Sequence, residues 1–154
     1  MQYRPFKDLS ISQLGFGAMR LPVRDGNEAD IDEEAAAQMV SAAFAAGINY
    51  FDTAWGYHSE NSETVMGRIL KEYPRDSFYL ATKFPGYDPA NLNRMEEIFT
   101  RQMEKLQTDY FDFYLFHALN RISYAKHKRL RTFETVSKLH QEGKLRHIAM
   151  SFHD

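Results

Sequence analysis

Four polar side chains follow apolar segments of the sequence and could act together in proton transfer: Asp52, Tyr57, Lys83 and His117. A free tyrosine has a pKa of about 10 and is a poor proton donor at neutral pH. A lysine ammonium close to a phenol lowers that pKa, and a carboxylate beside the lysine keeps the ammonium charged. An imidazole nearby could orient a carbonyl oxygen or share the proton. Such a group suits carbonyl reduction when a cofactor supplies hydride.

The apolar segments that carry these residues recur at a regular interval. The expected strands end near Met19, Asp52, Lys83, His117 and Ser151, so successive ends lie 33, 31, 34 and 34 residues apart. This interval fits one strand and one helix, repeated four times and followed by a fifth strand. The periodicity alone allows a doubly wound sheet or a (β/α)₈ barrel. Ionisable groups at the ends of several strands favour the barrel.

Helix signals separate these strands. Asp32 is a good N-cap for a helix that ends at Gly47. Asn61 or Ser62 can begin a second helix, and Asn91 can begin a third. The apolar face expected for the first helix consists of Ala35, Ala36, Met39, Val40, Ala43 and Phe44. This face predicts packing against a sheet.

The remaining segments have simpler signals. Residues 3–13 predict a short β-hairpin, and residues 14–19 predict a first buried strand that runs into a loop. The basic residues 121–131 predict a solvated loop leading into a helix, with phosphate binding as the lesser alternative. A fourth helix is expected from about Leu130 until Gly143 ends it.

Composition limits the partners of the chain. Its 154 residues suffice for one domain with a sizeable core. The net charge of −2 gives no general attraction to nucleic acid or to an anionic membrane. The absence of cysteine excludes disulfides and iron–sulfur ligands within this chain, and it fits a reducing cytoplasm. We find neither an apolar run near the roughly 18 residues of a membrane helix nor a hydrophobic secretion segment.

Other functions remain open on the residues alone. Asp52, His58, His117 and His153 lie near strand ends and could bind a divalent metal for hydrolysis, although no paired ligand spacing supports this. Gly17 belongs to a Gly-x-Gly pair without the third glycine of the dinucleotide fingerprint. A non-catalytic nucleotide-sensing or interaction module is the second alternative.

Four segments together resemble the aldo-keto reductase family. They are Gly47-x-x-Tyr50-Phe51-Asp52-Thr53-Ala54-x-x-Tyr57 with Glu60 and Glu63-x-x-x-Gly67; Leu80-Ala81-Thr82-Lys83; Leu106-x-Thr108-Asp109-Tyr110-x-Asp112-x-Tyr114-x-x-His117; and Glu142-Gly143-Lys144-Leu145-Arg146-His147-Ile148-Ala149-x-Ser151. The resemblance covers almost the whole chain. The two ends of the chain look most like a bacterial branch that carries a C-terminal iron–sulfur module.

The resemblance implies an α/β fold in which NADPH or NADH reduces small aldehydes and ketones. Tyr57 would be the general acid, and Asp52, Lys83 and His117 would assist it. The cofactor-binding residues would be Gly17, Met19, Arg20, Asp52 and Ser151, with Ser151 touching the nicotinamide amide. No metal site is implied in this chain, and any iron–sulfur cluster would lie in a C-terminal region outside it.

The chain departs from the family pattern in two ways. Many relatives have asparagine where Phe152 stands, so one nicotinamide contact differs. A barrel of this type also takes about 250 residues. We therefore expect residues 1–154 to form the N-terminal part of a (β/α)₈ TIM barrel, truncated after strand five, with five strands, four helices and a preceding β-hairpin. Open strand edges predict self-association of such a half barrel.

Overall fold

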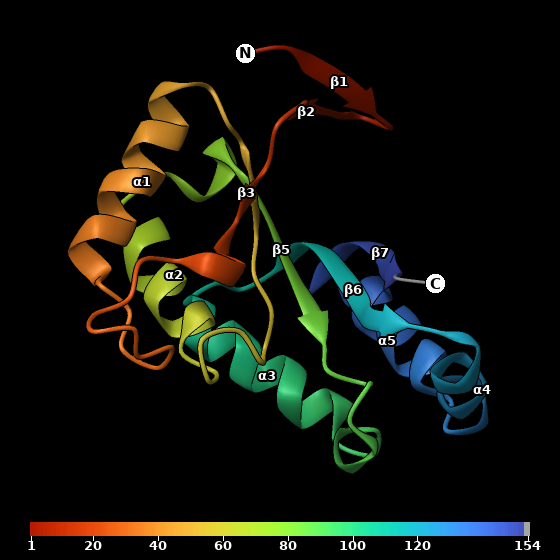
Figure 1. The fold of residues 1–154 in the computed structure, drawn as a ribbon. Helices are drawn as coiled ribbons and strands as arrows, with labels where there is room; N and C mark the ends of the chain where they lie inside the picture. The colour runs from red at the N-terminus through yellow and green to blue at the C-terminus, as the bar shows by residue number, and fades with distance from the viewer. Residues whose placement is uncertain (153–154) are drawn as a thin grey trace.

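The computed structural model describes residues 1–152. The chain begins with an antiparallel hairpin formed by β1 (Tyr3–Phe6) and β2 (Leu9–Ser12), as the sequence predicts. Figure 1 shows this hairpin at the end of the sheet from which the strands begin. There the Phe6 ring packs against Phe113 and His147, at centroid distances of 5.6 and 5.3 Å. The hairpin thus covers the end of the sheet opposite the predicted site.

A five-stranded parallel sheet follows, with its strands ordered as in the sequence, β3-β4-β5-β6-β7. The strands are β3 (Phe16–Gly17), β4 (Tyr50–Asp52), β5 (Tyr79–Phe84), β6 (Phe111–Leu119) and β7 (Leu145–Phe152). Each strand pairs in parallel with the next one. The carboxyl ends of all five strands therefore lie at the same edge of the sheet. The arrow of β5 in Figure 1 points toward this edge. The expected βα repeat with five parallel strands is confirmed.

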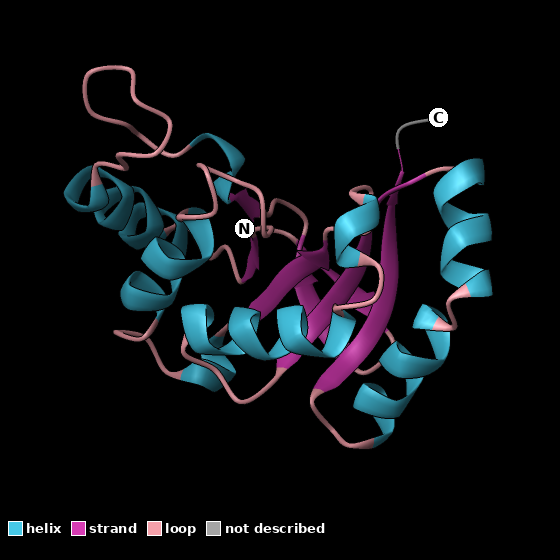
Figure 2. Ribbon diagram, turned by 90° about the horizontal axis from the view of Figure 1, so that it is seen from below, coloured by secondary structure: helices cyan, strands magenta, loops and turns pink. Residues whose placement is uncertain are grey.

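Helices join the strands and cover one face of the sheet (Figures 1 and 2). They are α1 (Glu33–Ala45), α2 (Ser62–Leu70), α3 (Met95–Leu106), α4 (Arg121–Arg129) and α5 (Thr132–Gln141), with 3₁₀ turns at Ala18–Arg20, Arg75–Ser77 and Pro89–Asn91. The Asp32 carboxylate accepts from the Ala35 N–H at 3.1 Å and caps α1 as predicted. Gly47 follows α1 with φ +83°, which a residue with a Cβ adopts only with strain. None of the helices described is long and apolar enough to cross a membrane.

Several expected boundaries were wrong. The strand predicted over residues 14–19 is formed by β3 alone, because the chain turns into a 3₁₀ helix at Ala18, and Leu14 and Met19 are exposed. The third helix begins at Met95 after a 3₁₀ turn, and not at Asn91. Lys83 and His117 lie inside β5 and β6, one and two residues before the strands end.

The buried face of α1 is narrower than predicted. Ala36, Val40 and Ala43 are buried, whereas Met39 is 44% exposed. The largest fully buried side chains elsewhere include Tyr114, Phe51, Phe84, Phe99, Phe111, Phe116, Met66 and Leu80. Most of them are strand residues that face the helices. Burial of these aromatic and aliphatic surfaces is the main favourable contribution to folding.

Helices α2 and α3 approach closely at Gly67, the glycine of the Glu63-x-x-x-Gly67 motif. A Cβ built on Gly67 would lie 2.2 Å from the Lys105 carbonyl oxygen and 2.8 Å from the Leu106 Cα. Both atoms belong to the backbone, so a side chain at this position would push the helices apart. The motif glycine therefore lets α3 lie against α2 near the predicted site.

Most of the basic segment 121–131 forms the helix α4 (Arg121–Arg129), where a solvated loop was expected. Asn120 caps α4, because its side chain accepts two backbone N–H bonds of the first turn, each at 2.9 Å. Arg131, with φ +58°, separates α4 from α5. The sequence predicted one helix here, which corresponds to α5, and α4 precedes it. The described residues therefore contain five α-helices where the sequence predicted four.

A buried histidine explains why this charged segment folds onto the sheet. His127 on α4 is 0% exposed and packs against the rings of Phe84, Phe116 and Phe133 at centroid distances of 5.8, 4.9 and 5.9 Å. The Thr132 hydroxyl donates to the His127 carbonyl oxygen at 3.2 Å, so it accepts from Nδ1 at 2.8 Å. Nε2 has no hydrogen-bond partner among the described residues. Burial of this ring disfavours its protonated, charged form.

We expect this burial to make the fold sensitive to acid. Burial lowers the pKa of His127 from its usual 6.5, so the unfolded chain binds the proton at a higher pH than the folded one. Stability should therefore fall as the pH drops below the usual histidine range, and His147, whose pKa is also lowered chiefly by burial, acts in the same direction. Urea midpoints at about pH 7.5 and about pH 5.5 measure this loss. A His127→Leu variant should lose less on acidification; an equal loss would contradict the assignment.

Strand β7 is open on one edge and on part of one face. Ile148 and Met150 lie opposite Tyr114 and Phe116 of β6 and so point toward the helix side, yet they are 43% and 57% exposed. Phe152 continues this row and is 58% exposed. An apolar row beside an unpaired strand edge is suited to bind further protein.

Candidate functional site

The centre of the site is an ion pair between neighbouring strands. Lys83 of β5 donates from Nζ to the Asp52 carboxylate of β4 and, at 2.8 Å, to the Thr53 carbonyl oxygen. The Lys83 side chain is 6% exposed and the Asp52 side chain 27%. Burial raises the pKa of the Asp52 carboxyl, and the Lys83 ammonium opposes this shift. The pair thus places a fixed ammonium at the carboxyl edge of the sheet.

Tyr57 lies in the loop after β4 and turns back over this ion pair. Its hydroxyl is 3.3 Å from Lys83 Nζ, and its ring centroid is 4.9 Å from the same atom. The ammonium therefore contacts a carboxylate, a carbonyl and a phenol at once. Because an ammonium has three donors, this arrangement can satisfy all of them.

His117 of β6 completes the group. Its ring lies 5.8 Å from the Tyr57 ring, with the two planes at 86°. All four side chains predicted from the sequence, Asp52, Tyr57, Lys83 and His117, therefore meet at one edge of the sheet. They come from three adjacent strands and one loop, as the spacing of the strand ends predicted.

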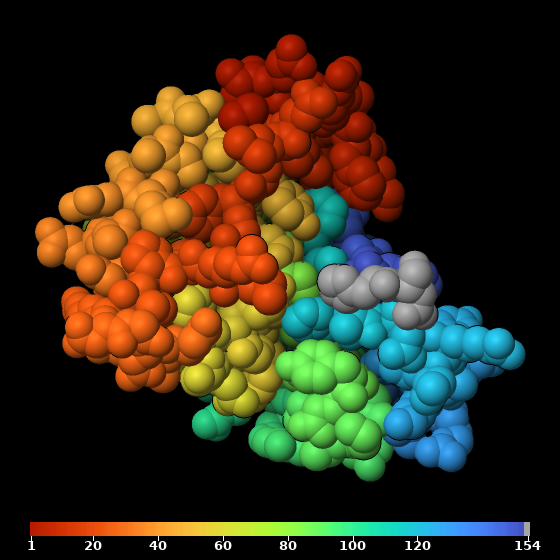
Figure 3. All heavy atoms as spheres, in the orientation of Figure 1, coloured from red at the N-terminus to blue at the C-terminus, as the bar shows by residue number. Residues whose placement is uncertain are grey.

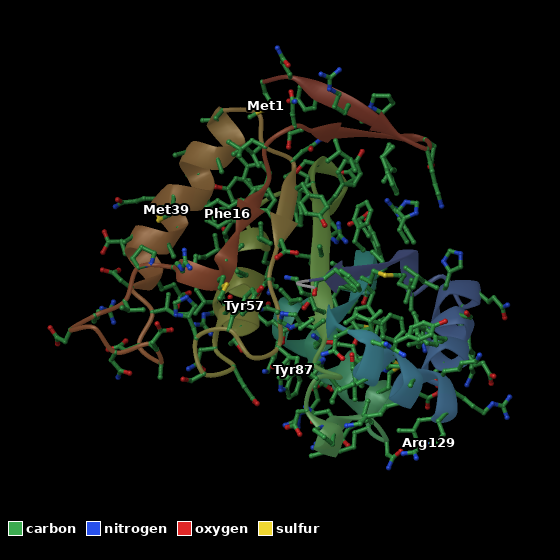
Figure 4. The ribbon with its side chains drawn as sticks, turned by 45° about the vertical axis from the view of Figure 1, so that its right-hand side comes forward. Met1, Phe16, Met39, Tyr57, Tyr87 and Arg129 are labelled. Atoms are coloured by element: carbon green, nitrogen blue, oxygen red, sulfur yellow. The ribbon has the colours of Figure 1, made fainter. Side chains whose placement is uncertain are left out.

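A second tyrosine, which sequence reasoning missed, also packs against His117. The Tyr87 ring is 5.2 Å from the His117 ring at 83°, and a Cβ built on Gly56 would lie 2.7 Å from the Tyr87 hydroxyl. Figure 4 shows Tyr57 and Tyr87 near each other, and in Figure 3 the light-green loop after β5 lies between the yellow segment after β4 and the cyan α4. The only sequence signal was a loop position directly after the Lys83 strand.

A buried polar network supports Lys83 from the helix side. Gln102 of α3 donates from Nε2 to the Lys83 carbonyl oxygen at 3.0 Å and to Glu63 Oε1 at 2.6 Å. Thr82 donates to the same Glu63 oxygen at 2.6 Å, and the Tyr114 hydroxyl donates to Gln102 at 2.7 Å. Burial raises the pKa of Glu63 and also that of Tyr114. The network links α2, α3, β5 and β6 directly behind the ion pair.

Asp52 of the ion pair is also one of the residues predicted to bind a cofactor. The others lie on β3, in the 3₁₀ turn after it and on β7. Gly17 ends β3, and a Cβ built on it would meet nothing within 4 Å, so the backbone is open to a ligand. Met19 and Arg20 follow in the 3₁₀ turn, and both are exposed. Ser151 lies on β7, where its hydroxyl accepts from the Ala118 N–H at 2.6 Å.

The ligand set considered for a metal does not assemble. His58 is buried, and its Nε2 accepts from the Leu21 N–H at 2.9 Å. Its Nδ1 therefore carries the proton and donates to the Glu28 carbonyl oxygen at 3.0 Å. His153 lies outside the described residues. Within residues 1–152 no group of three or more suitable side chains could hold a metal ion.

Known proteins share this fold and this sequence pattern. A sequence model of the aldo/keto reductase family matches residues 13–154. L-galactose dehydrogenase of Arabidopsis thaliana is 34% identical over 150 residues, which cover 93% of this chain and 45% of that protein. The holo form of an aldo-keto reductase from Bacillus halodurans aligns with a TM-score of 0.77 and 30% identity, over 99% of this chain and 50% of that one. An aldo-keto reductase from Klebsiella pneumoniae in complex with NADPH aligns with a TM-score of 0.70 and 26% identity, over 94% and 47%.

The chain therefore belongs to the aldo/keto reductase family of oxidoreductases. It spans about half the length of the relatives it matches. The five parallel strands β3 to β7 align with these structures over about half of their length. These comparisons give no support for the iron–sulfur module that the ends of the chain suggested.

Proposed function

We propose that this chain carries the catalytic group of an NAD(P)H-dependent reductase that converts a small aldehyde or ketone to an alcohol. The contact that carries the proposal is the 3.3 Å approach of the Tyr57 hydroxyl to Lys83 Nζ, with Asp52 fixing the ammonium from the other side. A phenol in this position can give its proton to a carbonyl oxygen while the carbon receives hydride. Membership of the aldo/keto reductase family supports the same reaction.

Each residue has a role in this proposal. Tyr57 donates the proton, and the negative charge left on its oxygen lies beside the Lys83 ammonium, which stabilises it. Asp52 holds the ammonium in place. His117, whose ring stands at 86° to the Tyr57 ring, orients the carbonyl oxygen or shares its hydrogen bond. The set is preorganised because the Lys83 backbone is anchored by Gln102.

A nicotinamide cofactor, NADPH or NADH, would supply the hydride to the carbonyl carbon. The chain offers a partial fit for it. Gly17 leaves the backbone open, Met19 and Arg20 are exposed next to it, and Ser151 lies on β7 with a hydroxyl held by the Ala118 N–H. Phe152 stands where many relatives have asparagine. It continues the exposed apolar row of β7 and adds no polar group next to Ser151. Cofactor binding through these residues alone is therefore expected to be weak.

We further propose a small carbonyl compound as the substrate, neither nucleic acid nor membrane as a partner, and the cytoplasm as the compartment. The net charge of −2 and the absence of cysteine support these proposals. Self-association of the 154-residue chain through the open edge of β7 stays a prediction.

The test of the isolated chain is direct. We expect the purified 154-residue protein to bind NADPH poorly and to give no NADPH oxidation with a reactive aldehyde above a blank without protein. The reason is that this chain spans only about half the length of the aldo-keto reductase structure it matches, whereas a barrel of this type takes about 250 residues. Absorbance at the NADPH band measures the rate, and a full-length aldo-keto reductase assayed in the same way serves as the positive control. Clear turnover by the 154-residue chain would contradict this expectation.

A further inference from the structure

Lys105 of α3 contacts the loop that carries Tyr57 from outside the catalytic group. Its Nζ lies 4.0 Å from the centroid of the Trp55 ring and donates to the Glu60 carbonyl oxygen at 3.0 Å. The Glu63 carboxylate is 3.8 Å away on a third side. The Trp55 indole N–H in turn donates to the Glu60 side chain at 2.9 Å. One ammonium thus joins both ends of the loop over Trp55–Glu60 (the Tyr57 loop below).

The Tyr57 loop has a backbone that requires such support. His58, Ser59 and Glu60 all have positive φ, at +53°, +52° and +70°. Three consecutive residues with side chains in the left-handed region are strained, and the surrounding structure must hold them there. Because Tyr57 directly precedes them, any relaxation of this turn would move its ring.

The loop is held at two points. The buried His58 ring bonds to the Leu21 N–H and the Glu28 carbonyl, at 2.9 and 3.0 Å. Lys105 contacts Trp55 and Glu60. The Lys105 side chain is only 21% exposed, so its cation–π and hydrogen-bond contacts are partly shielded from water. Lys105 thus contacts residues on both sides of Tyr57 in the sequence, and the Tyr57 hydroxyl lies 3.3 Å from Lys83 Nζ.

We propose that Lys105 is a positioning residue for Tyr57, acting through Trp55 and Glu60. The catalytic part of this inference rests on the proposed function, whereas its structural part does not. Replacing the ammonium by a neutral side chain of similar length removes the cation–π contact and the hydrogen bond to Glu60 together. The turn then relaxes, and the Tyr57 ring leaves its contact with His117.

The experiment compares Lys105→Met and Lys105→Arg with Lys71→Met, a matched control at the exposed end of α2. Trp55 is the single tryptophan of the protein, so the tryptophan fluorescence reports on the surroundings of this ring. In the purified 154-residue chain we expect Lys105→Met to raise acrylamide quenching of Trp55 about twofold and amide exchange in residues 56–60 about tenfold. Proton cross-relaxation between the Tyr57 and His117 rings, expected in the wild type, should be lost. Lys105→Arg should recover most of each signal.

In the complete gene product, Lys105→Met should lower kcat for aldehyde reduction about tenfold with KM within about twofold, and Lys105→Arg should recover it. Unchanged quenching and exchange in Lys105→Met, or an intact Tyr57–His117 signal, would overturn the proposal. An active wild type whose kcat does not respond to Lys105→Met would overturn it too. If the wild type reduces no carbonyl, the proposed function fails, and the ring-to-ring signal still decides whether Lys105 positions Tyr57.

Discussion

Replacing Tyr57 by phenylalanine in the complete gene product is expected to lower kcat for aldehyde reduction by about a thousandfold. The change removes one hydroxyl and nothing else. The ring that contacts His117 and the Lys83 ammonium, at 5.8 and 4.9 Å, remains in place. Without the phenol, no group in the site holds a proton 3.3 Å from Lys83 for the carbonyl oxygen. Steady-state kinetics with NADPH give kcat, and fluorescence titration gives the cofactor affinity, which should not change.

A matched control separates loss of the proton donor from general damage. Tyr124→Phe removes a hydroxyl from an exposed tyrosine on α4 and should leave kcat within about twofold. The cofactor titration also distinguishes the two functions that the sequence left open. Loss of reduction with retained cofactor binding supports the reductase. If reduction is unaffected by Tyr57→Phe, Tyr57 is not the general acid; if neither form reduces a carbonyl but both bind the cofactor, the chain belongs to a nucleotide sensor.

The four catalytic candidates could be predicted from the sequence because their arrangement depends on topology and not on exact strand boundaries. Lys83 and His117 lie inside β5 and β6, although the sequence placed them at the strand ends. Parallel strands in sequential order still bring both residues to the same edge as Asp52. An error of one or two residues therefore left the predicted grouping intact.

The supporting residues could not be predicted because each depends on partners that are distant in the sequence. Gln102 is a polar residue among the inward positions of α3, and it is fully buried only because Glu63, Tyr114 and the Lys83 backbone satisfy it. His127 lies in a basic segment whose charge pattern indicates a solvated loop. The segment is a helix, and the His127 ring on it packs against aromatic rings of β5, β6 and α5. Local patterns do not contain such contacts.

A second buried charge lies at the end of the sheet opposite the site. Asp112 of β6 is 0% exposed and accepts from the Leu80 N–H at 2.9 Å, from Arg75 at 2.7 Å and from Arg146 at 3.0 Å. Both guanidinium groups also stack on the Tyr110 ring, with Cζ 3.9 and 4.4 Å from its centroid. One carboxylate thus joins β5, β6, β7 and the segment before β5.

Replacing Asp112 by alanine is expected to lower the free energy of unfolding by about 3 kcal/mol. The buried Leu80 N–H would lose its acceptor, and two arginines would lose their counterion. This loss in the free energy of unfolding is at the lower end of the values for a broken buried ion pair. The reason is that the side chains of Arg75 and Arg146 are 26% and 49% exposed and remain partly hydrated. Urea unfolding followed by circular dichroism measures the change.

Two further variants locate the cause of this loss. Asp109→Ala removes a nearby exposed carboxylate and should change stability by less than about 0.5 kcal/mol. Asp112→Asn keeps an acceptor for the Leu80 N–H and removes the charge, so it should lose less than Asp112→Ala. A loss below about 1 kcal/mol in Asp112→Ala would mean that hydrated arginines offset the missing carboxylate. The strands would then be held together at this end by apolar packing, chiefly that of Phe6 against Phe113 and His147.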